Sequence, residues 1–413
     1  MTVDLSELKR TEFPACVKQG LRKLEDILHM PNVSHQQDIQ LQIMDHFIFF
    51  CRDSSSSKIR AVGPVEELVV VRELAQYLGK MVDAASRNSL FITLFHPSTH
   101  DPRTQHKLRI LSALVSLAIA THNVSVLEAT AVWMQQVCCL STSDFLSGEV
   151  FRKVIQDYFQ LTPTSPQHFA GALRALPTMA PLFTANLITT LSQLYAKVGS
   201  GEVCEQPPDA LVSTVVWWLQ GNQGAPSHLA LAPLTHPLPG VSLPMTAVPP
   251  VAPLMKWCVE SPFFDKPTVI SAPFESPARR SSFPKVMEVE ALYDKNPGKV
   301  QTECSDQYSK LHLSVIQTLQ SVPSFRDRMT QKQVLCPKHV TSVVDAVCER
   351  IRTCNEKQSE AVNMSLDRLA QTILVALHTE CLSGSLSDMW DALHRLPTKN
   401  RLITTLLSTR EAR

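Results

Sequence analysis

The stretch LRILSALVSLAIA, residues 108–120, decides the fold class of this chain. Its apolar side chains cover almost the whole circumference of a helix, so it predicts a central buried helix. A short polar turn separates it from SVLEATAVWMQQVCCL, residues 125–140, which has the same helical spacing. The two stretches together predict neighbouring antiparallel helices.

Further helical patterns extend outward from this pair over the first 220 residues. Pro64 predicts the start of a helix in which Leu68, Leu74, Leu78 and Met81 face one way. Sustained alternation with a period of two is absent, and no fixed repeat length emerges. The pattern therefore predicts an all-α fold, an irregular α-solenoid of HEAT-like helix pairs in which each pair packs on its neighbours. The other helices expected in this part cover residues 16–29, 147–161, 166–177, 181–198 and 209–220.

The composition changes at residue 221 and again near residue 265. Proline is frequent from 221 onward, which disfavours helices, although the segment is rich in Leu, Val and Ala. The sequence therefore predicts four parts. They are an N-terminal helical-repeat domain (1–220), an apolar Pro-rich extended segment with a short helix (221–264), a flexible linker (265–301) and a C-terminal helical domain (302–413).

The C-terminal part opens with YSKLHLSVIQTLQ, residues 308–320. Tyr308, Leu311 and Val315 recur at helical spacing and form one apolar face. We expect this helix to pair with the two helices that follow it as a small bundle. That bundle either docks back on the N-terminal helices or serves a partner, and the sequence leaves both possibilities open.

Charge and composition exclude several classes of protein. The formal net charge is +1, so no global field attracts nucleic acid. The N-terminus is polar, and the longest nearly apolar run, 110–120, is far shorter than the ~20 residues that span a bilayer. The 11 cysteines are scattered through helical patterns. We therefore expect a soluble protein of a reducing compartment with no membrane contact.

One histidine-rich segment resembles a metal site. His96, His100, Asp101 and His106 fall within HPSTHDPRTQH, but Pro97 and Pro102 interrupt it and no HExxH frame fixes the geometry. A polar loop before the 103–121 helix is the more typical interpretation.

A second segment has zinc-like spacing. Cys336 and His339 form a Cys-x2-His pair, with Cys348 and Cys354 downstream. The latter two lie about 240° apart around a predicted helix, so they face different ways. We expect no metal at either segment.

Catalytic and nucleotide-binding motifs are missing from the sequence. It contains no G-x-S-x-G elbow, no G-x-x-x-x-G-K-[ST] loop and no dinucleotide fingerprint. The sequence thus predicts no enzyme, no cofactor and no small-molecule substrate. An enzyme with an unrecognised site is the alternative that these absences leave open.

The segment ARRSS, residues 278–282, is the one local basic spot within the predicted linker. Ser281 and Ser282 are possible phosphorylation sites, because Arg-Arg-x-Ser suits basophilic kinases. A weak targeting element and a simple solvated patch are the alternatives.

Large apolar side chains supply the candidate partner surface. Adjacent residues point about 100° apart on a helix, so Trp217 and Trp218 cannot both face one core. Buried aromatic anchors dominate many protein interfaces. The hypothesised partner-binding residues are Trp217, Trp218, Tyr308, Leu311, Val315, Trp390 and Leu393.

Several phrases spread over nearly the whole chain resemble the Integrator complex subunit 15 family. They are GPVEEL (63–68), LVSLAIATHNVSVLEATAVWMQ (114–135), ALVSTVVWWL (210–219), APLMKWCV (252–259), YSKLHLSVIQTLQ (308–320) and MSLDRLAQTILVAL (364–377). None of them is a catalytic motif.

The resemblance implies a non-enzymatic helical-repeat subunit of the nuclear Integrator complex. It implies association with the arm module, chiefly subunit 10 together with subunits 13 and 14. It also implies a part in small nuclear RNA 3′-end processing and in RNA polymerase II transcript attenuation. The alternative that the residues leave open is a stand-alone helical adaptor that binds short peptides.

Overall fold

The computed structural model describes most of the helical parts of the chain. The described residues are 5–30, 36–52, 59–96, 104–138, 150, 153–154, 166–195, 207, 209–220, 251–264, 297–322, 334–354, 359–382, 384–396 and 399–411. Regular structure in these ranges is almost entirely α-helical, which confirms the all-α prediction. Most of the expected 147–161 helix, the extended part of 221–264 and most of the predicted linker lie outside the described residues.

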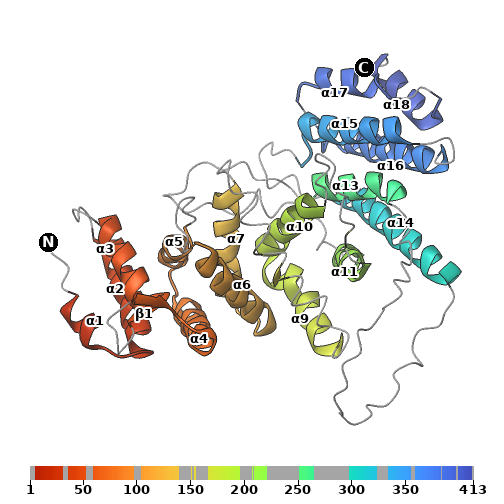
Figure 1. Ribbon diagram of the computed structural model, residues 1–413. Helices are drawn as coiled ribbons and strands as arrows, with labels where there is room; N and C mark the ends of the chain where they lie inside the picture. Colours follow the sequence, from red (N-terminus) through yellow and green to blue (C-terminus); the bar gives the residue numbers. More distant parts are fainter. Residues whose placement is uncertain are drawn as a thin grey trace, which may run out of the picture.

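The helices follow one another along the molecule from α1 at the N-terminal end to α17 and α18 at the other (Figure 1). The first ten are α1 (Ser6–Arg10), α2 (Ala15–His29), α3 (Gln36–Ile43), α4 (Pro64–Lys80), α5 (Ala84–Leu94), α6 (Thr104–Ala120), α7 (Val124–Cys138), α9 (Pro166–Met179), α10 (Pro181–Tyr195) and α11 (Asp209–Gln220). The others are α13 (Val251–Glu260), α14 (Pro297–Ser321), α15 (Pro337–Thr353), α16 (Ser359–His378), α17 (Ser387–Leu393) and α18 (Arg401–Glu411). Their buried apolar residues form one contiguous cluster that reaches from the first helix to the last.

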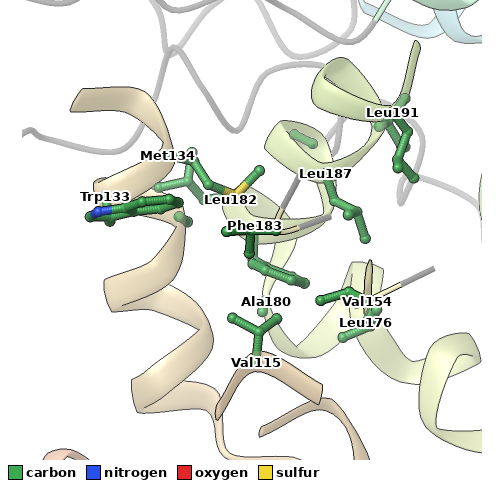
Figure 2. Packing of buried hydrophobic residues seen from close by; sticks show 14 of the residues in the cluster. Val115, Trp133, Met134, Val154, Leu176, Ala180, Leu182, Phe183, Leu187 and Leu191 are labelled. Atoms are coloured by element: carbon green, nitrogen blue, oxygen red, sulfur yellow. The ribbon is translucent and has the colours of Figure 1, made fainter. Parts of the chain in front are cut away.

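The stretch that decides the fold class is buried as predicted. Leu111, Leu114 and Ala118 of α6 are inaccessible to solvent, and α6 packs against α4, α7 and α9. Figure 2 shows how α7 and α10 meet beside α6, with Trp133 and Phe183 among the buried side chains. The indole of Trp133 also donates a hydrogen bond of 2.9 Å to the carbonyl oxygen of Phe95.

The turn between α6 and α7 fixes their antiparallel arrangement. His122 has a positive φ of 55°, and Asn123 accepts a hydrogen bond from the backbone of Val126, which caps the start of α7. The Asn123 amide also donates to Ala75 of α4. A Cβ atom at Gly79 would lie 2.9 Å from that amide nitrogen, so glycine at this position lets the Asn123 side chain come this close to α4.

Helix α4 begins at Pro64 as predicted, but one face of it was assigned wrongly. The Glu66 carboxylate accepts a hydrogen bond of 2.6 Å from the Gly63 N–H, which stabilises the helix start. Leu74 and Leu78 are buried, whereas Leu68 is 69% exposed. Leu68 lies about 120° around the helix from Leu74, so these two residues cannot share one stripe.

A π-helix and a pair of short strands precede α4, and the sequence did not predict them. The π-helix η1 (Met44–Ile48) leads into β1 (Phe50–Arg52), which pairs antiparallel with β2 (Ile59–Ala61). Strands of three residues are too short to show alternation in a sequence.

Helix α14 connects the C-terminal helices to the helices that precede residue 265. It packs against α11 and α13 as well as α16, and α15 packs chiefly on α17. The expected pairing with the two following helices therefore holds for α16, while α11 and α13 supply the rest of the contact. Helix α14 starts at Pro297, which lies inside the predicted linker 265–301. The four-part division, with its boundary at residue 302, stays a prediction.

Candidate partner interface

A buried junction joins three of the sequence phrases quoted above. Arg368 of α16 donates through Nη1 to the carbonyl oxygen of Cys258 at 2.9 Å and to Oγ of Ser261 at 2.6 Å. Its Nη2 donates to Oγ of Ser309 at 3.1 Å. The guanidinium thus ties the end of α13 and the following η4 (Ser261–Phe263) to α14 and α16. A cation at a helix C-terminus is favourable because it faces the negative end of the helix dipole.

His312 completes this junction from α14. Its Nε2 donates to the carbonyl oxygen of Arg368 at 3.2 Å and lies 3.3 Å from Oγ1 of Thr372. Burial, assisted by the Arg368 charge, lowers the pKa of His312 to about 4. The imidazole is therefore neutral at physiological pH and serves as a packing group.

A second buried charge lies at the end of α13. Glu260 is only 1% exposed, and its Oε1 is 3.8 Å from Nζ of Lys256. Burial raises the pKa of the Glu260 carboxyl, while the charges of Lys256 and Arg350 oppose that shift. Within the described residues Oε1 accepts no hydrogen bond, so the carboxylate is held at a free-energy cost.

Most of the hypothesised partner-binding residues lie inside the chain. Trp218 donates from its indole to the Leu173 carbonyl oxygen at 2.8 Å, and it packs within the core. The other buried members of the set are Tyr308, Leu311, Val315, Trp390 and Leu393. These side chains pack α14 and α17 against their neighbouring helices. Their role in partner binding stays a hypothesis.

Trp217 is the exposed member of that set, at 41%. The Arg174 guanidinium of α9 lies 5.3 Å from the centroid of its ring, a cation–π arrangement. Arg174 was not identified from the sequence, because no local pattern reveals that α9 and α11 are neighbours. The other exposed large apolar residues of the described ranges are Met30, Leu41, Val65, Leu68, Val82, Leu313 and Met364.

One Ser–His–Asp cluster occurs near the start of α5, and its geometry is structural. The Ser86 hydroxyl donates its hydrogen to Asp83, and the Ser86 backbone N–H donates to the same carboxylate at 2.8 Å. His29 Nε2 lies 3.1 Å from Oγ of Ser86. A catalytic triad requires the carboxylate to orient the histidine. Here the carboxylate binds the serine, and Asp83 caps the helix.

The histidine-rich segment is only partly within the described ranges. His106 uses both ring nitrogens: Nε2 donates to the Phe49 carbonyl oxygen at 3.1 Å, and Nδ1 lies 3.2 Å from Nη2 of Arg109. Burial lowers the pKa of this imidazole. His100 and Asp101 lie outside the described residues.

The Cys-x2-His segment forms the start of α15. The Cys336 N–H donates to Nδ1 of His339 at 3.4 Å, so the histidine caps the helix. Burial raises the pKa of both Cys348 and Cys354, which keeps these thiols protonated. In the described ranges no three His, Cys, Asp or Glu side chains are grouped so that they could hold a metal ion.

The predicted phosphorylation sites and the membrane-spanning potential of the helices remain to be described. Ser281 and Ser282 lie outside the described residues, so phosphorylation there stays a prediction. None of the described helices combines the length and the apolar character needed to cross a membrane.

The fold and its buried junctions define an all-α protein whose described polar clusters serve helix packing and helix capping. Comparison with known families is more specific: the family model of Integrator complex subunit 15 matches residues 4–398. The chain belongs to the Integrator complex subunit 15 family, and the resemblance inferred from the sequence phrases is confirmed.

Curated relatives agree over most of their length. Integrator complex subunit 15 of Drosophila melanogaster is 25% identical over 391 residues, which cover 92% of this chain and 90% of the relative. The Danio rerio protein of that name is 26% identical over 371 residues, covering 88% of this chain and 70% of the relative. The Homo sapiens protein is 25% identical over 374 residues, covering 88% and 76%.

Proposed function

We propose that this chain is a non-catalytic scaffold subunit of the nuclear Integrator complex. In this proposal it associates with the arm module, chiefly subunit 10 together with subunits 13 and 14. Through that association it takes part in small nuclear RNA 3′-end processing and in RNA polymerase II transcript attenuation. The observation that carries the proposal is the family match over residues 4–398.

The structure supports a scaffold by the way it uses its polar groups. Arg368, His312 and Glu260 lie where helices meet, and the Ser86 hydroxyl belongs to a helix cap. With a formal net charge of +1, affinity for other subunits depends on apolar and aromatic contact area more than on long-range attraction.

Affinity purification of the tagged full-length chain, combined with cross-linking mass spectrometry, tests the proposal. We expect subunits 10, 13 and 14 to be recovered at near-equal stoichiometry from the nuclear fraction, with cross-links to this chain. Recovery of short-peptide ligands without any Integrator subunit would favour the stand-alone adaptor instead.

Point substitutions are a sharper test than removal of residues 302–413. That truncation cuts α14 after its first turn and a half and uncovers the buried faces of α11 and α13. A truncated chain that lost its partners would therefore report misfolding as readily as a lost interface. Exposed residues such as Trp217 avoid this ambiguity.

A further inference from the structure

Trp217 and Arg174 lie on a surface formed by two neighbouring helices. We call it the Trp217–Arg174 surface and define it by Arg174 and Thr178 of α9 and by Ala210, Thr214 and Trp217 of α11. Arg174 and Thr178 lie one turn apart, as do Ala210, Thr214 and Trp217, so each set shares a helix face.

The polar groups of this surface differ in whether their hydrogen bonds are already made within the chain. The hydroxyls of Thr178 and Thr214 donate their hydrogens to their own helices, to the carbonyl oxygens of Ala175 and Ala210. Arg174 is exposed, and its recorded contact is the face of Trp217. Among the residues that the structure describes, no carboxylate forms an ion pair with it. Within the described ranges, the surface therefore offers an aromatic ring beside a positive charge that no carboxylate pairs with.

We propose that this surface binds a segment of another Integrator subunit that presents a carboxylate beside an apolar side chain. The proposal rests on the proposed function and names the chemistry of the partner. The carboxylate pairs with Arg174, and the apolar side chain packs on the exposed part of Trp217. Tryptophan and arginine are the residue types that most often dominate interface energies, and covering the pair strengthens their cation–π contact by excluding water.

Charge complementarity distinguishes this occupant from two others. The chain leaves α11 close to Trp217 and continues as residues 221–250, but this stretch contains no Asp or Glu. It therefore cannot neutralise Arg174. A second copy bound about a two-fold axis through this surface would bring two Arg174 side chains together, and like charges disfavour that arrangement.

The test uses the full-length tagged chain and quantitative recovery of Integrator subunits. We expect Trp217→Ala and Arg174→Glu each to reduce recovery at least tenfold. Raising the salt concentration should weaken wild-type recovery more than that of Arg174→Gln, because the variant lacks the charge. The matched control is Leu41→Ala, a 47% exposed apolar residue of α3, which should stay within twofold of wild type.

Folding is checked separately, by circular dichroism and thermal unfolding. Surface substitutions should shift the midpoint by no more than about 2 °C. A photo-reactive phenylalanine analogue placed at Trp217 supplies a readout that does not depend on these variants. We expect it to cross-link to a peptide of another Integrator subunit that contains Asp or Glu beside an apolar residue.

The outcomes separate this inference from the proposed function. Wild type recovering Integrator subunits while all variants recover them equally would overturn the surface and leave the proposed function intact. A cross-link to residues 221–250 or to a second copy of the chain would also overturn the surface. Recovery of no Integrator subunit by wild type would overturn both.

Discussion

Nη1 of Arg368 donates a hydrogen bond of 2.9 Å to the carbonyl oxygen of Cys258, although the two residues are 110 positions apart. The guanidinium is buried, and the neighbouring groups that it also binds are the neutral hydroxyls of Ser261 and Ser309. The arginine therefore stabilises the junction through oriented dipoles, including the C-terminal end of α13.

Arg368→Met should destabilise the protein more than removal of any exposed arginine. The substitution keeps much of the side-chain volume but removes three hydrogen bonds that Arg368 donates, to the Cys258 carbonyl and to the hydroxyls of Ser261 and Ser309. The Cys258 carbonyl keeps the hydrogen bond from the Ser261 hydroxyl, and we expect a total cost of about 1–3 kcal/mol. Denaturant unfolding measures the loss, and hydrogen exchange should accelerate in residues 251–264. The control is Arg352→Met, because the Arg352–Glu349 pair is largely exposed and contributes little. Equal effects of the two substitutions would contradict the assigned role of Arg368.

His312 should make the protein less stable as the pH falls. Its pKa is about 4 in the folded state and about 6.5 when unfolded, so the unfolded state binds the proton more tightly. The contribution of neutral His312 to the unfolding free energy is fully present above pH ~6.5. It is lost between pH ~6.5 and ~4, and the loss is at most about 3 kcal/mol. The difference in unfolding free energy between wild type and His312→Gln should therefore shrink over this range.

Burial also lowers the pKa of the half-buried His106 and His339, so the His312→Gln variant retains part of the pH dependence. The control is His378→Gln, which removes an exposed histidine from the end of α16. If His312→Gln left the whole pH profile unchanged, the buried position of this imidazole would be wrong.

Glu260→Gln should stabilise the protein at neutral pH. Because burial raises the pKa of the Glu260 carboxyl, the folded state binds this proton more tightly than the unfolded state. Wild-type stability therefore falls as the pH rises from 4.5 through the raised pKa, and the variant lacks this loss. The gain, of about 1 kcal/mol or more, should be larger at pH 8 than at pH 5 in thermal unfolding. Glu349→Gln, on the exposed side of α15, serves as the control. A destabilised Glu260→Gln variant would show instead that Lys256 and Arg350 fully compensate the carboxylate.

The orientation of α4 gives a simple packing test. Leu74→Ala should cost about 2–5 kcal/mol, because Leu74 is buried and its loss leaves a cavity. Leu68→Ala should change the unfolding free energy by no more than about 0.5 kcal/mol, because Leu68 is mostly exposed. Similar losses for both substitutions would mean that the two residues do share one buried face.

Local periodicity predicted much of the fold, because burial of a helix repeats every three or four residues. Leu111, Leu114 and Ala118 followed that rule closely, and Pro64 marked a helix start correctly. Leu68 did not, because an apolar residue can lie on an exposed face without breaking any local pattern. The sequence did not predict the pairing of β1 with β2, because strands of three residues are too short to show alternation.

The candidate interface was harder to predict, since it depends on contacts between distant parts of the chain. The adjacency of Trp217 and Trp218 implied that the two rings face different ways. Only the structure shows that Trp218 is the buried ring and Trp217 the exposed one. Arg368 carried a weak signal, because it is a charged residue between the apolar residues Leu366 and Leu369. Arg174 carried none, because its partner is Trp217 on a different helix.

The packing of α14 on α11 has a consequence for how the polypeptide is held together. These helices belong to opposite sides of the stretch 265–296, and their contact is built from buried side chains. We therefore expect this contact to hold the two parts together when the covalent link between them is cut. Residues 1–264 and 297–413, produced as separate polypeptides in one cell, would reassemble into a nicked molecule with the native core.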